Sequence, residues 1–314
     1  MLENQREGDW LMLWQNANSV IVGLNQNAAE EVDPAYVRAH GIRVVRRMTG
    51  GGAVYHDLGN LNYSFITDAL DTASLSMEAL ARPVCRALSA LGVAAELSGR
   101  NDICVEGRKV SGTAQRLSRG RVLHHGTLLF DTDAEALSGA LRADPEKFRS
   151  KAARSVRSRV GNIRDFLPAD MDLGEFRRAI LAELTRGGLV RESLTETELE
   201  RVRTLAAEKY ESWEWNWGRA PDFGFRSRRR FPGGSMEVRL DIHAGHIRDA
   251  AFAGDFMAMT GWDRAREALS GRRFERGDVR AALEGLPLRE MFGGITLGEI
   301  LTLMFGEDAE DEGL

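Results

Sequence analysis

Short apolar, β-branched or aromatic runs are frequent in the first 130 residues and are typical of β-strands. One of them, 61–67, alternates apolar and polar positions, which is the pattern of a half-buried strand. Four of these runs are "WLMLWQ" (10–15), "SVIVGL" (19–24), "IRVVRRM" (42–48) and "LNYSFIT" (61–67). Four further strand candidates cover 93–97, 102–106, 109–117 and 122–130. A short polar stretch with Asn16 and Asn18 divides the first two runs, so we expect two adjacent strands joined by a tight turn.

Helical periodicity and capping residues predict helices between and after these strands. One helix is expected near 33–40, where Asp33 can cap the first turn and Pro34 takes the first helical position. Others are expected at 75–91, 133–141, 175–187 and 196–210. The first 220 residues therefore predict an α+β domain built on a large, mostly antiparallel sheet.

The composition changes near residues 213–233, where aromatic residues, Pro, Gly and "RSRRR" gather, and we interpret 221–232 as a linker. A hairpin is expected at 235–254 around Ala244-Gly245. Helices are expected near 262–270, 276–284 and 296–305. Residues 233–314 thus predict a small α+β domain, and its acidic ending "GEDAEDEGL" predicts disorder.

Composition narrows the classes of function. The 314 residues are 43% hydrophobic and 28% charged with a net charge of −5, so no global basic field would attract nucleic acid. Two cysteines, Cys85 and Cys104, cannot build a disulfide framework and favour a reducing compartment. No apolar run approaches the roughly 20 residues that cross a bilayer, and no signal peptide is evident. We expect a soluble cytoplasmic protein that acts away from membranes.

The stretch "RRMTGGGAVYHDLGN" (46–60) contains the first candidate site. Three successive glycines can turn their backbone N–H groups toward one ligand and form an anion-binding concavity. Arg46 and Arg47 lie just upstream, and alternation along a strand would direct one of them to the ligand side. A tight turn beside a surface arginine is the alternative. The loop fits neither G-x-G-x-x-G before a helix nor the P-loop pattern.

A second candidate site lies in "SGRNDICVEGRKVSGTAQR" (98–116). A hairpin turn at Gly107-Arg108 would place Lys109 at the start of the returning strand, next to small residues that allow a ligand close to the backbone. Asn101 and Asp102 would face it from the opposing strand. A solvated edge lysine is the alternative.

The third stretch is "LHHGTLLF" (123–130), in which His124 and His125 must point to opposite faces of a strand. They cannot bind one metal ion together, and no other His or Cys cluster has zinc spacing, so we predict no protein metal site. A hydrogen-bonding role for one histidine and a structural role stay equally open. Cys104 is interpreted as a buried thiol.

These three stretches, in this order, resemble the lipoate–protein ligases, in the bacterial form with a C-terminal accessory domain. The segments "KAARSVRSRVGNI" (151–163) and "SWEWNWGRAPDF" (212–223) are also similar to segments of that family. The resemblance covers nearly the whole chain. It implies a catalytic domain at 1–220 with the class II synthetase-like fold of the biotin/lipoate ligase superfamily, followed by an accessory domain at 233–314.

The resemblance implies a two-step reaction in a monomeric enzyme. Lipoate and ATP, with Mg²⁺, would give lipoyl-AMP and pyrophosphate. The lipoyl group would then pass to a lysine of an acceptor domain, in the E2 subunit of a 2-oxoacid dehydrogenase or in the glycine-cleavage H protein.

The resemblance also implies roles for particular residues. Lys109 matches the catalytic and ligand-binding lysine, and Arg47 matches a nucleotide-contacting arginine. The expected ATP- and lipoyl-AMP-binding set is Arg46, Arg47, Gly51, Gly52, Ala53, Val54, Tyr55, Asn101, Asp102, Lys109, Ala114 and His125. Slim residues of the glycine loop would form one wall of an apolar slot for the acyl tail.

One departure concerns the start of the chain. The family has a further helix with an Asn-Leu-Ala-x-Glu-Glu type motif, whereas here only nine residues precede "WLMLWQ". We therefore expect most of that helix to be missing, with "MLENQRE" as its last turns, and stability to be lower or the lipoyl pocket more open.

Two alternative functions stay open at this point. An octanoyl or lipoyl transferase of the same superfamily needs no ATP and uses an acyl-cysteine or an acyl-carrier donor. A non-catalytic lipoate-binding protein would have a degenerate site. The C-terminal domain and the joint presence of Arg47, the glycine loop and Lys109 favour the ligase.

Overall fold

The computed structural model describes residues 7–68, 76–99, 101–141, 160–219 and 222–307. The chain divides into two compact units. Unit 1 comprises Met1–Leu24 and Arg43–Arg203, and unit 2 comprises Asn25–Ile42 and Thr204–Leu314. The expected last helical turns at 1–6, most of the 151–163 segment and the acidic ending from 308 lie outside the described residues.

Unit 1 is built on a six-stranded sheet in the order β1-β5-β9-β8-β7-β6. Every neighbouring pair is antiparallel, which confirms the expected large antiparallel sheet. Its strands are β1 (Trp10–Trp14), β5 (Asn60–Asp68), β6 (Glu96–Ser98), β7 (Asp102–Val105), β8 (Arg108–Ser118) and β9 (Arg121–Leu129).

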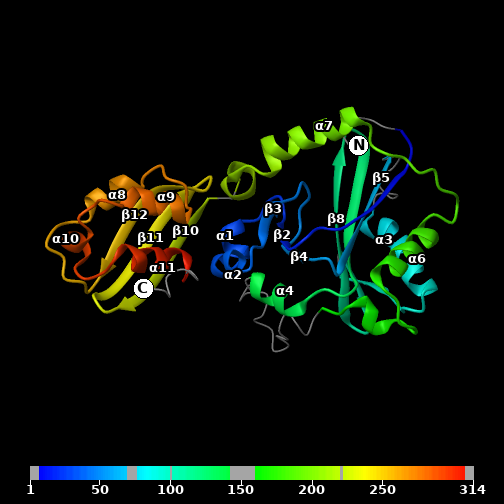
Figure 1. Ribbon diagram of the computed structural model, residues 1–314, viewed down its shortest axis with the longest axis horizontal. Coiled ribbons are helices and arrows are strands. Elements are labelled where there is room, and N and C mark those ends of the chain that lie inside the picture. Colours follow the sequence, from blue (N-terminus) through cyan, green and yellow to red (C-terminus); the bar gives the residue numbers. More distant parts are fainter. Residues whose placement is uncertain (1–6, 69–75, 100, 142–159, 220–221, 308–314) are drawn as a thin grey trace. The chain divides into compact units, whose positions relative to one another are not determined.

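Helices cover one face of this sheet (Figure 1). Alternate strand residues such as Leu61, Val110 and Leu128 are fully buried there against α3 (Met77–Ala90) and α6 (Leu173–Leu184). The capping box of Asp172 and Glu175 begins α6. The other face of the sheet is the one that carries the candidate site.

A second sheet of three strands lies on the side of the large sheet away from α3 and α6 (Figure 1). Its strands are β2 (Ser19–Val22), β3 (Arg43–Arg46) and β4 (Val54–His56). The expected tight-turn pairing of the first two strands is wrong, because β1 pairs with β5 while β2 pairs with β3 and β4. All four residues of β2 are buried. A strand that is buried on both faces is better accommodated between two neighbouring strands than in a hairpin with β1.

Unit 1 also contains α4 (Ala134–Ala140) and the 3₁₀ turn η2 (Ile163–Phe166). Helix α7 (Glu196–Leu205) has no buried residue and crosses the division between the units. No helix within the described ranges is both long and apolar enough to span a membrane.

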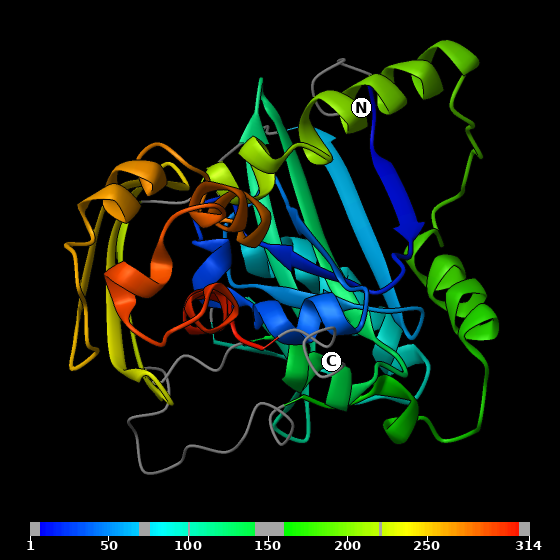
Figure 2. The same cartoon turned by 60° about the vertical axis from the view of Figure 1, so that its left-hand side comes forward.

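Unit 2 contains a three-stranded antiparallel sheet, β10 (Phe223–Phe231), β11 (Gly234–His243) and β12 (His246–Gly254). The hairpin expected at Ala244-Gly245 is confirmed, and both turn residues have positive φ. Helices lie on one side of the sheet (Figure 2) and share with it a core that includes Val238, Leu240 and Phe292. They are α8 (Asp263–Leu269), α9 (Arg276–Leu283), α10 (Leu288–Phe292) and α11 (Leu297–Phe305).

Two parts of unit 2 differ from the sequence interpretation. Residues 223–231, expected within the linker 221–232, form strand β10 because Phe223, Phe225 and Phe231 pack against the core of unit 2. Residues 25–42, with helices α1 (Ala28–Glu31) and α2 (Pro34–Ala39), group with unit 2 rather than with the strands on either side of them. The remaining elements are η3 (Ala206–Tyr210) and η4 (Glu214–Gly218).

Candidate active site

The site face of the large sheet is defined by the register of its central strands. His125 on β9 lies opposite Ala114 on β8 and Ser64 on β5, and the Gly112 amide donates to the Thr127 hydroxyl at 3.1 Å. His124 belongs to the opposite face, where it is fully buried beside the rings of Tyr63 and Phe65. The prediction that the two histidines face opposite ways is therefore confirmed.

Lys109 and Asp102 meet on this face across the hairpin between β7 and β8. The Lys109 Nζ lies 2.7 Å from Asp102 Oδ1, and both side chains are one-third exposed. A bulge between Ile103 and Cys104 brings Asp102 opposite Gly112. A Cβ at Gly112 would lie 3.0 Å from the Lys109 Nζ, so the ammonium crosses the strand where a side chain is missing. Asp102 thus fixes a partly exposed cation against bare backbone.

Arg47 follows β3 and holds the glycine loop. Its Nη2 donates to the carbonyls of Gly50 at 2.7 Å and Gly52 at 2.8 Å, and its Nη1 donates to Ile21 O at 2.9 Å. Burial lowers the pKa of Arg47 to about 10, which leaves it charged at neutral pH. Arg46 has no exposed surface and donates to the carbonyls of residues 23 and 24, so of the two arginines Arg47 is the one at the loop.

The three glycines of the loop differ in what they require. Gly51 has φ +92°, and a Cβ there would lie 3.0 Å from the Arg47 Nη2, so this position needs glycine for both conformation and space. Around Gly50 and Gly52 no atom would lie within 4 Å of an added Cβ. The backbone of Gly50 and Gly52 therefore faces space that the protein's own side chains leave open.

Two neutral histidines adjoin Arg47. The Thr49 hydroxyl lies 2.7 Å from His125 Nε2, and burial together with the charge of Arg47 lowers the pKa of His125 to about 4. Burial, Arg47 and His125 lower the pKa of His56 to about 3, and Asn16 Nδ2 donates to its Nδ1 at 3.1 Å. The glycine loop and His125 thus form one connected group on the site face.

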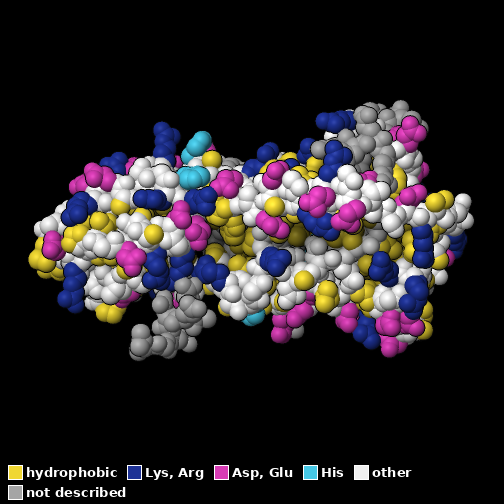
Figure 3. Space-filling model, turned by 45° about the horizontal axis from the view of Figure 1, so that its top comes forward, with side chains coloured by type: hydrophobic (Ala, Val, Ile, Leu, Met, Phe, Trp, Pro, Cys, Tyr) yellow, Lys and Arg dark blue, Asp and Glu magenta, His cyan; other side chains and the backbone are white. Residues whose placement is uncertain are grey.

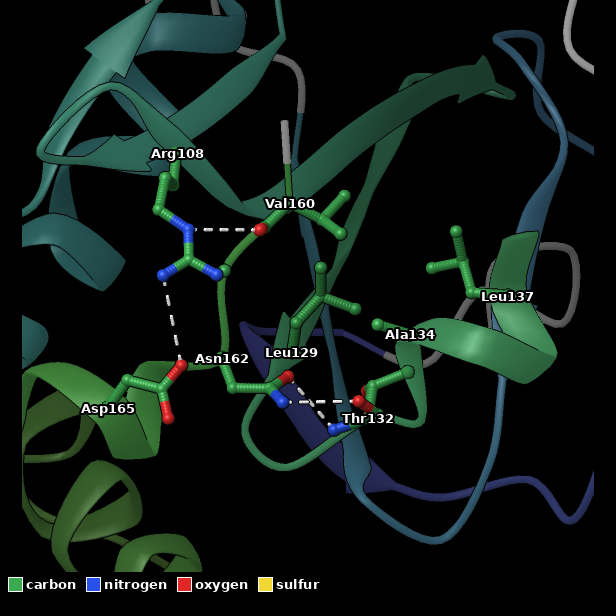
Figure 4. A pocket seen from close by; sticks show the side chains of 9 residues that line it. Arg108, Leu129, Thr132, Ala134, Leu137, Val160, Asn162 and Asp165 are labelled. Carbon is green, nitrogen blue, oxygen red and sulfur yellow. Dashed lines mark hydrogen bonds and ion pairs between the residues drawn. The ribbon is translucent and has the colours of Figure 1, made fainter. Parts of the chain in front are cut away.

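A cavity of about 330 Å³ lies beside the strand that carries Lys109 (Figure 4). Its wall includes Arg108, whose Nε donates to Val160 O at 3.1 Å, while the Gly161 amide donates to Lys109 O at 2.9 Å. Asn162 closes another side by two hydrogen bonds to the Thr132 backbone. The remaining lining residues are Leu129, Ala134, Leu137 and Asp165.

The other expected site residues are distributed around these groups. Val54 and Tyr55 form β4 directly after the glycine loop, and Tyr55 is almost fully buried. Ala53 is half-buried between the loop and β4, and Ala114 lies opposite His125. The Asn101 side chain donates to Thr113 O at 3.0 Å, which ties it to strand β8.

Sequence reasoning did not single out Thr49, Arg116 or Thr127, which belong to the same surroundings. The Arg116 Nη1 donates to Met48 O at 3.0 Å, two residues ahead of the glycines. Alternation could have identified two of them, because Arg116 is two positions from Ala114 and Thr127 is two from His125.

Two further features of the part of the chain that the structure describes are its surface charge and its possible metal ligands. On the face drawn in Figure 3, basic side chains are interspersed with acidic ones rather than gathered in a field of one sign. Among the residues that the structure describes, no group of three or more His, Cys, Asp or Glu is placed to hold a metal ion. The Asp102 carboxylate is paired with Lys109.

The chain matches two family models. Residues 1–185 match the lipoyl protein ligase A/B catalytic domain, and residues 220–304 match the bacterial lipoate protein ligase C-terminus. A lipoate-protein ligase of Bacillus subtilis (strain 168) is 42% identical over 303 residues, which cover 95% of this chain and 92% of that protein.

Solved structures are similar as well. A bi-partite lipoate protein ligase from Thermoplasma acidophilum, from a study of an archaeal lipoylation system with its E2 lipoyl domain, has a TM-score of 0.61 and 36% identity, covering 68% of this chain and 85% of its own. A lipoate-protein ligase A bound with ATP has a TM-score of 0.59 and 33% identity, covering 68% and 87%. The chain therefore belongs to the lipoate–protein ligase family.

Proposed function

We propose that this protein is an ATP-dependent lipoate–protein ligase that forms lipoyl-AMP and then transfers the lipoyl group to a lysine of an acceptor domain. The observation that carries the proposal is the single face on which Lys109, held over Gly112 by Asp102, and the Arg47–glycine loop are joined through β8 and β9. The relative bound with ATP supports the nucleotide as a substrate.

In the first step, the lipoate carboxylate attacks the α-phosphorus of ATP, a new P–O bond forms, and pyrophosphate leaves. Negative charge accumulates on the phosphoryl oxygens, and a fixed cation stabilises it more than water does. We assign this role to Lys109, whose ammonium Asp102 holds in place. Removing a donor of this kind typically costs about 2.7–4 kcal/mol of transition-state stabilisation.

In the second step, the acceptor lysine, as a free amine, attacks the carbonyl carbon of lipoyl-AMP. The amide C–N bond forms, AMP leaves with the electrons of the C–O bond, and the amine gives up its proton. Negative charge now develops on the carbonyl oxygen. This oxygen belongs to the same carbon whose bond to the phosphate oxygen breaks. One ammonium close to both oxygens can therefore serve both steps.

We assign the nucleoside part of ATP to the cavity beside Lys109 and the acyl chain to the open space at Gly50 and Gly52. Backbone N–H groups and the Arg47 charge would attract the phosphates, although Arg47 must then exchange bonds to loop carbonyls for bonds to phosphate. Mg²⁺ is expected to enter with the phosphates of ATP, because a magnesium ion commonly keeps its water and phosphate ligands.

The transferase alternative has less support. Cys104 is 8% exposed, its side chain lies on the hairpin with Lys109, and burial raises the pKa of its thiol, which disfavours the nucleophilic thiolate.

The E2 lipoyl domain of the Thermoplasma acidophilum system favours lipoyl domains of 2-oxoacid dehydrogenases as acceptors, with the glycine-cleavage H protein as a second class. We place the monomeric enzyme in the cytoplasm.

The test is pyrophosphate release from ATP with free lipoate, followed by lipoylation of an acceptor domain detected by mass. A ligase releases pyrophosphate and modifies the acceptor, whereas a transferase or a non-catalytic binder releases none. We expect the Lys109→Met protein to fold and bind ATP but to lose both steps. Wild-type rates of lipoyl-AMP formation in that variant would exclude the assigned role.

A further inference from the structure

Thr49 lies between the side chains of Arg47 and His125, next to the glycine loop. It is 2% exposed, it accepts a hydrogen bond from Arg47 Nε at 3.1 Å, and its oxygen lies 2.7 Å from His125 Nε2. It thus connects the Arg47 cation, which directly follows β3, to an imidazole on β9.

The direction of each hydrogen bond follows from the groups involved. A guanidinium only donates, so the Thr49 oxygen accepts from Arg47. The hydroxyl has one proton, and among the described residues His125 Nε2 is the one acceptor within hydrogen-bond distance of it, so we assign the proton to this bond and the accepting lone pair to Nε2. A neutral imidazole whose Nε2 accepts carries its proton on Nδ1. The low pKa of His125, caused by burial and by Arg47, agrees with a neutral ring.

The proton on His125 Nδ1 is available to donate a hydrogen bond to a ligand. Within the described ranges, no group accepts a hydrogen bond from His125 Nδ1. His125 lies opposite Ala114 on β8, two positions from Gly112, where the Lys109 ammonium crosses the strand. His125 therefore lies on the same face of the sheet as the cation that we assign to the reacting atoms, one strand away from it.

We propose that Thr49 is a positioning residue of the ligase reaction, which fixes His125 as an Nδ1–H donor to a carboxyl oxygen of the acyl substrate. The inference deepens the proposed function and rests on it. A saturated acyl chain has strong acceptors only at its carboxyl group, so the acid end of lipoate is the part that such a donor can recognise.

The first test reads the tautomer directly. Two-bond ¹H–¹⁵N spectra of ¹⁵N-histidine protein at pH 7 should show His125 with its proton on Nδ1, in the wild type and in Thr49→Ser. In Thr49→Val the Nε2 loses its donor, and the resonances should move toward those of the other tautomer. An Nε2–H form in the wild type, or identical His125 resonances in the wild type and Thr49→Val, would overturn the proposal.

The second test separates substrate positioning from folding. In pyrophosphate release, Thr49→Val should raise the KM for lipoate about tenfold to a hundredfold, as expected for one lost hydrogen bond to a charged group, while the KM for ATP stays unchanged. Thr49→Ser should restore the wild-type value. Thr67→Val is the matched control, because it also removes one hydroxyl hydrogen bond, to Asp9 at 2.6 Å, outside the site.

Equal increases in both KM values, or a Thr49→Ser enzyme as impaired as Thr49→Val, would contradict the assignment to the acyl carboxyl group. Failure of the ligase reaction itself is distinguishable. If the wild type releases no pyrophosphate, the proposed function fails, whereas the ¹⁵N spectra still report whether Thr49 fixes the tautomer of His125.

Discussion

Replacing Gly112 by alanine should damage catalysis without damaging the fold. An added Cβ would lie 3.0 Å from Lys109 Nζ and 3.1 Å from its Cε, closer than nearly all real contacts of a Cβ. Backbone is not the obstacle, because the three nearest atoms are all in the side chains of Lys109 and Asp102. The flexible end of Lys109 must therefore move, and the 2.7 Å pair with Asp102 is lengthened or lost.

The substitution has two effects, one on the stability of the fold and one on the rate of adenylation. The position has no positive φ, so alanine fits the strand and should raise stability by about 0.5–1 kcal/mol through a less flexible unfolded chain. Complete loss of a transition-state donor costs about 2.7–4 kcal/mol, and a displaced ammonium loses part of that, so we expect adenylation to slow roughly ten- to a hundredfold.

The assay is single-turnover formation of lipoyl-AMP, with urea unfolding for stability. Gly224→Ala is the matched control, since its Cβ would meet only Leu240 O at 4.0 Å on a strand of unit 2. In the Lys109→Met background, Gly112→Ala should have no further effect on the rate. A Gly112→Ala enzyme with wild-type rates, or an equal loss in the Lys109→Met background, would refute the reasoning.

Three further predictions concern other residues of unit 1. Gly52→Val should leave the urea midpoint unchanged, because its Cβ has free space, but should raise the KM for lipoate at least tenfold by filling that space; an unchanged KM would show that the acyl chain lies elsewhere. Gly126→Ala should destabilise unit 1 by about 3 kcal/mol in urea unfolding, since its Cβ would lie 2.5 Å from the hydroxyl of the fully buried Tyr63. Burial lowers the pKa of His124 from 6.5 to about 4, so the unfolded chain binds more protons between these values and stability falls as the pH drops through them. From pH 7 to 5, His124→Leu should lose about 2 kcal/mol less stability than the wild type; equal losses in parallel urea titrations would contradict the shift.

Much of unit 1 could be predicted from local patterns, because alternation reports which face of a strand is buried. His124 and His125 illustrate this, since their opposite faces follow from period two alone. The pairing of the strands could not be predicted from alternation in the same way. The run 19–22 has three apolar residues in succession after Ser19, and only its burial between β3 and β4 shows that it leaves the large sheet.

Strand β10 shows the opposite error, in which composition outweighed periodicity. The sequence "FGFRSRRRF" looks like a polar linker because arginines dominate it. Its Phe223, Phe225 and Phe231 nevertheless occur at the even spacings that place residues on one face of a strand, and that face packs on the core of unit 2. The arginines at 226, 228 and 230 belong to the other face, where Arg226 pairs with Glu237 at 2.9 Å and holds the pKa of that carboxyl at about 2, together with Arg239.

The glycine loop could be recognised from the sequence, but which of its three glycines the backbone requires could not. Only Gly51 needs glycine for its backbone, and its neighbours Gly50 and Gly52 are free to accept a side chain. The fold alone therefore does not require glycine at those two positions. Under the proposed function, a substrate that lies against their bare backbone would require it, because a Cβ would take the volume that the substrate needs. Arg47 bonds to the carbonyls on either side of Gly51, and it is the residue that would have to release them when phosphate arrives.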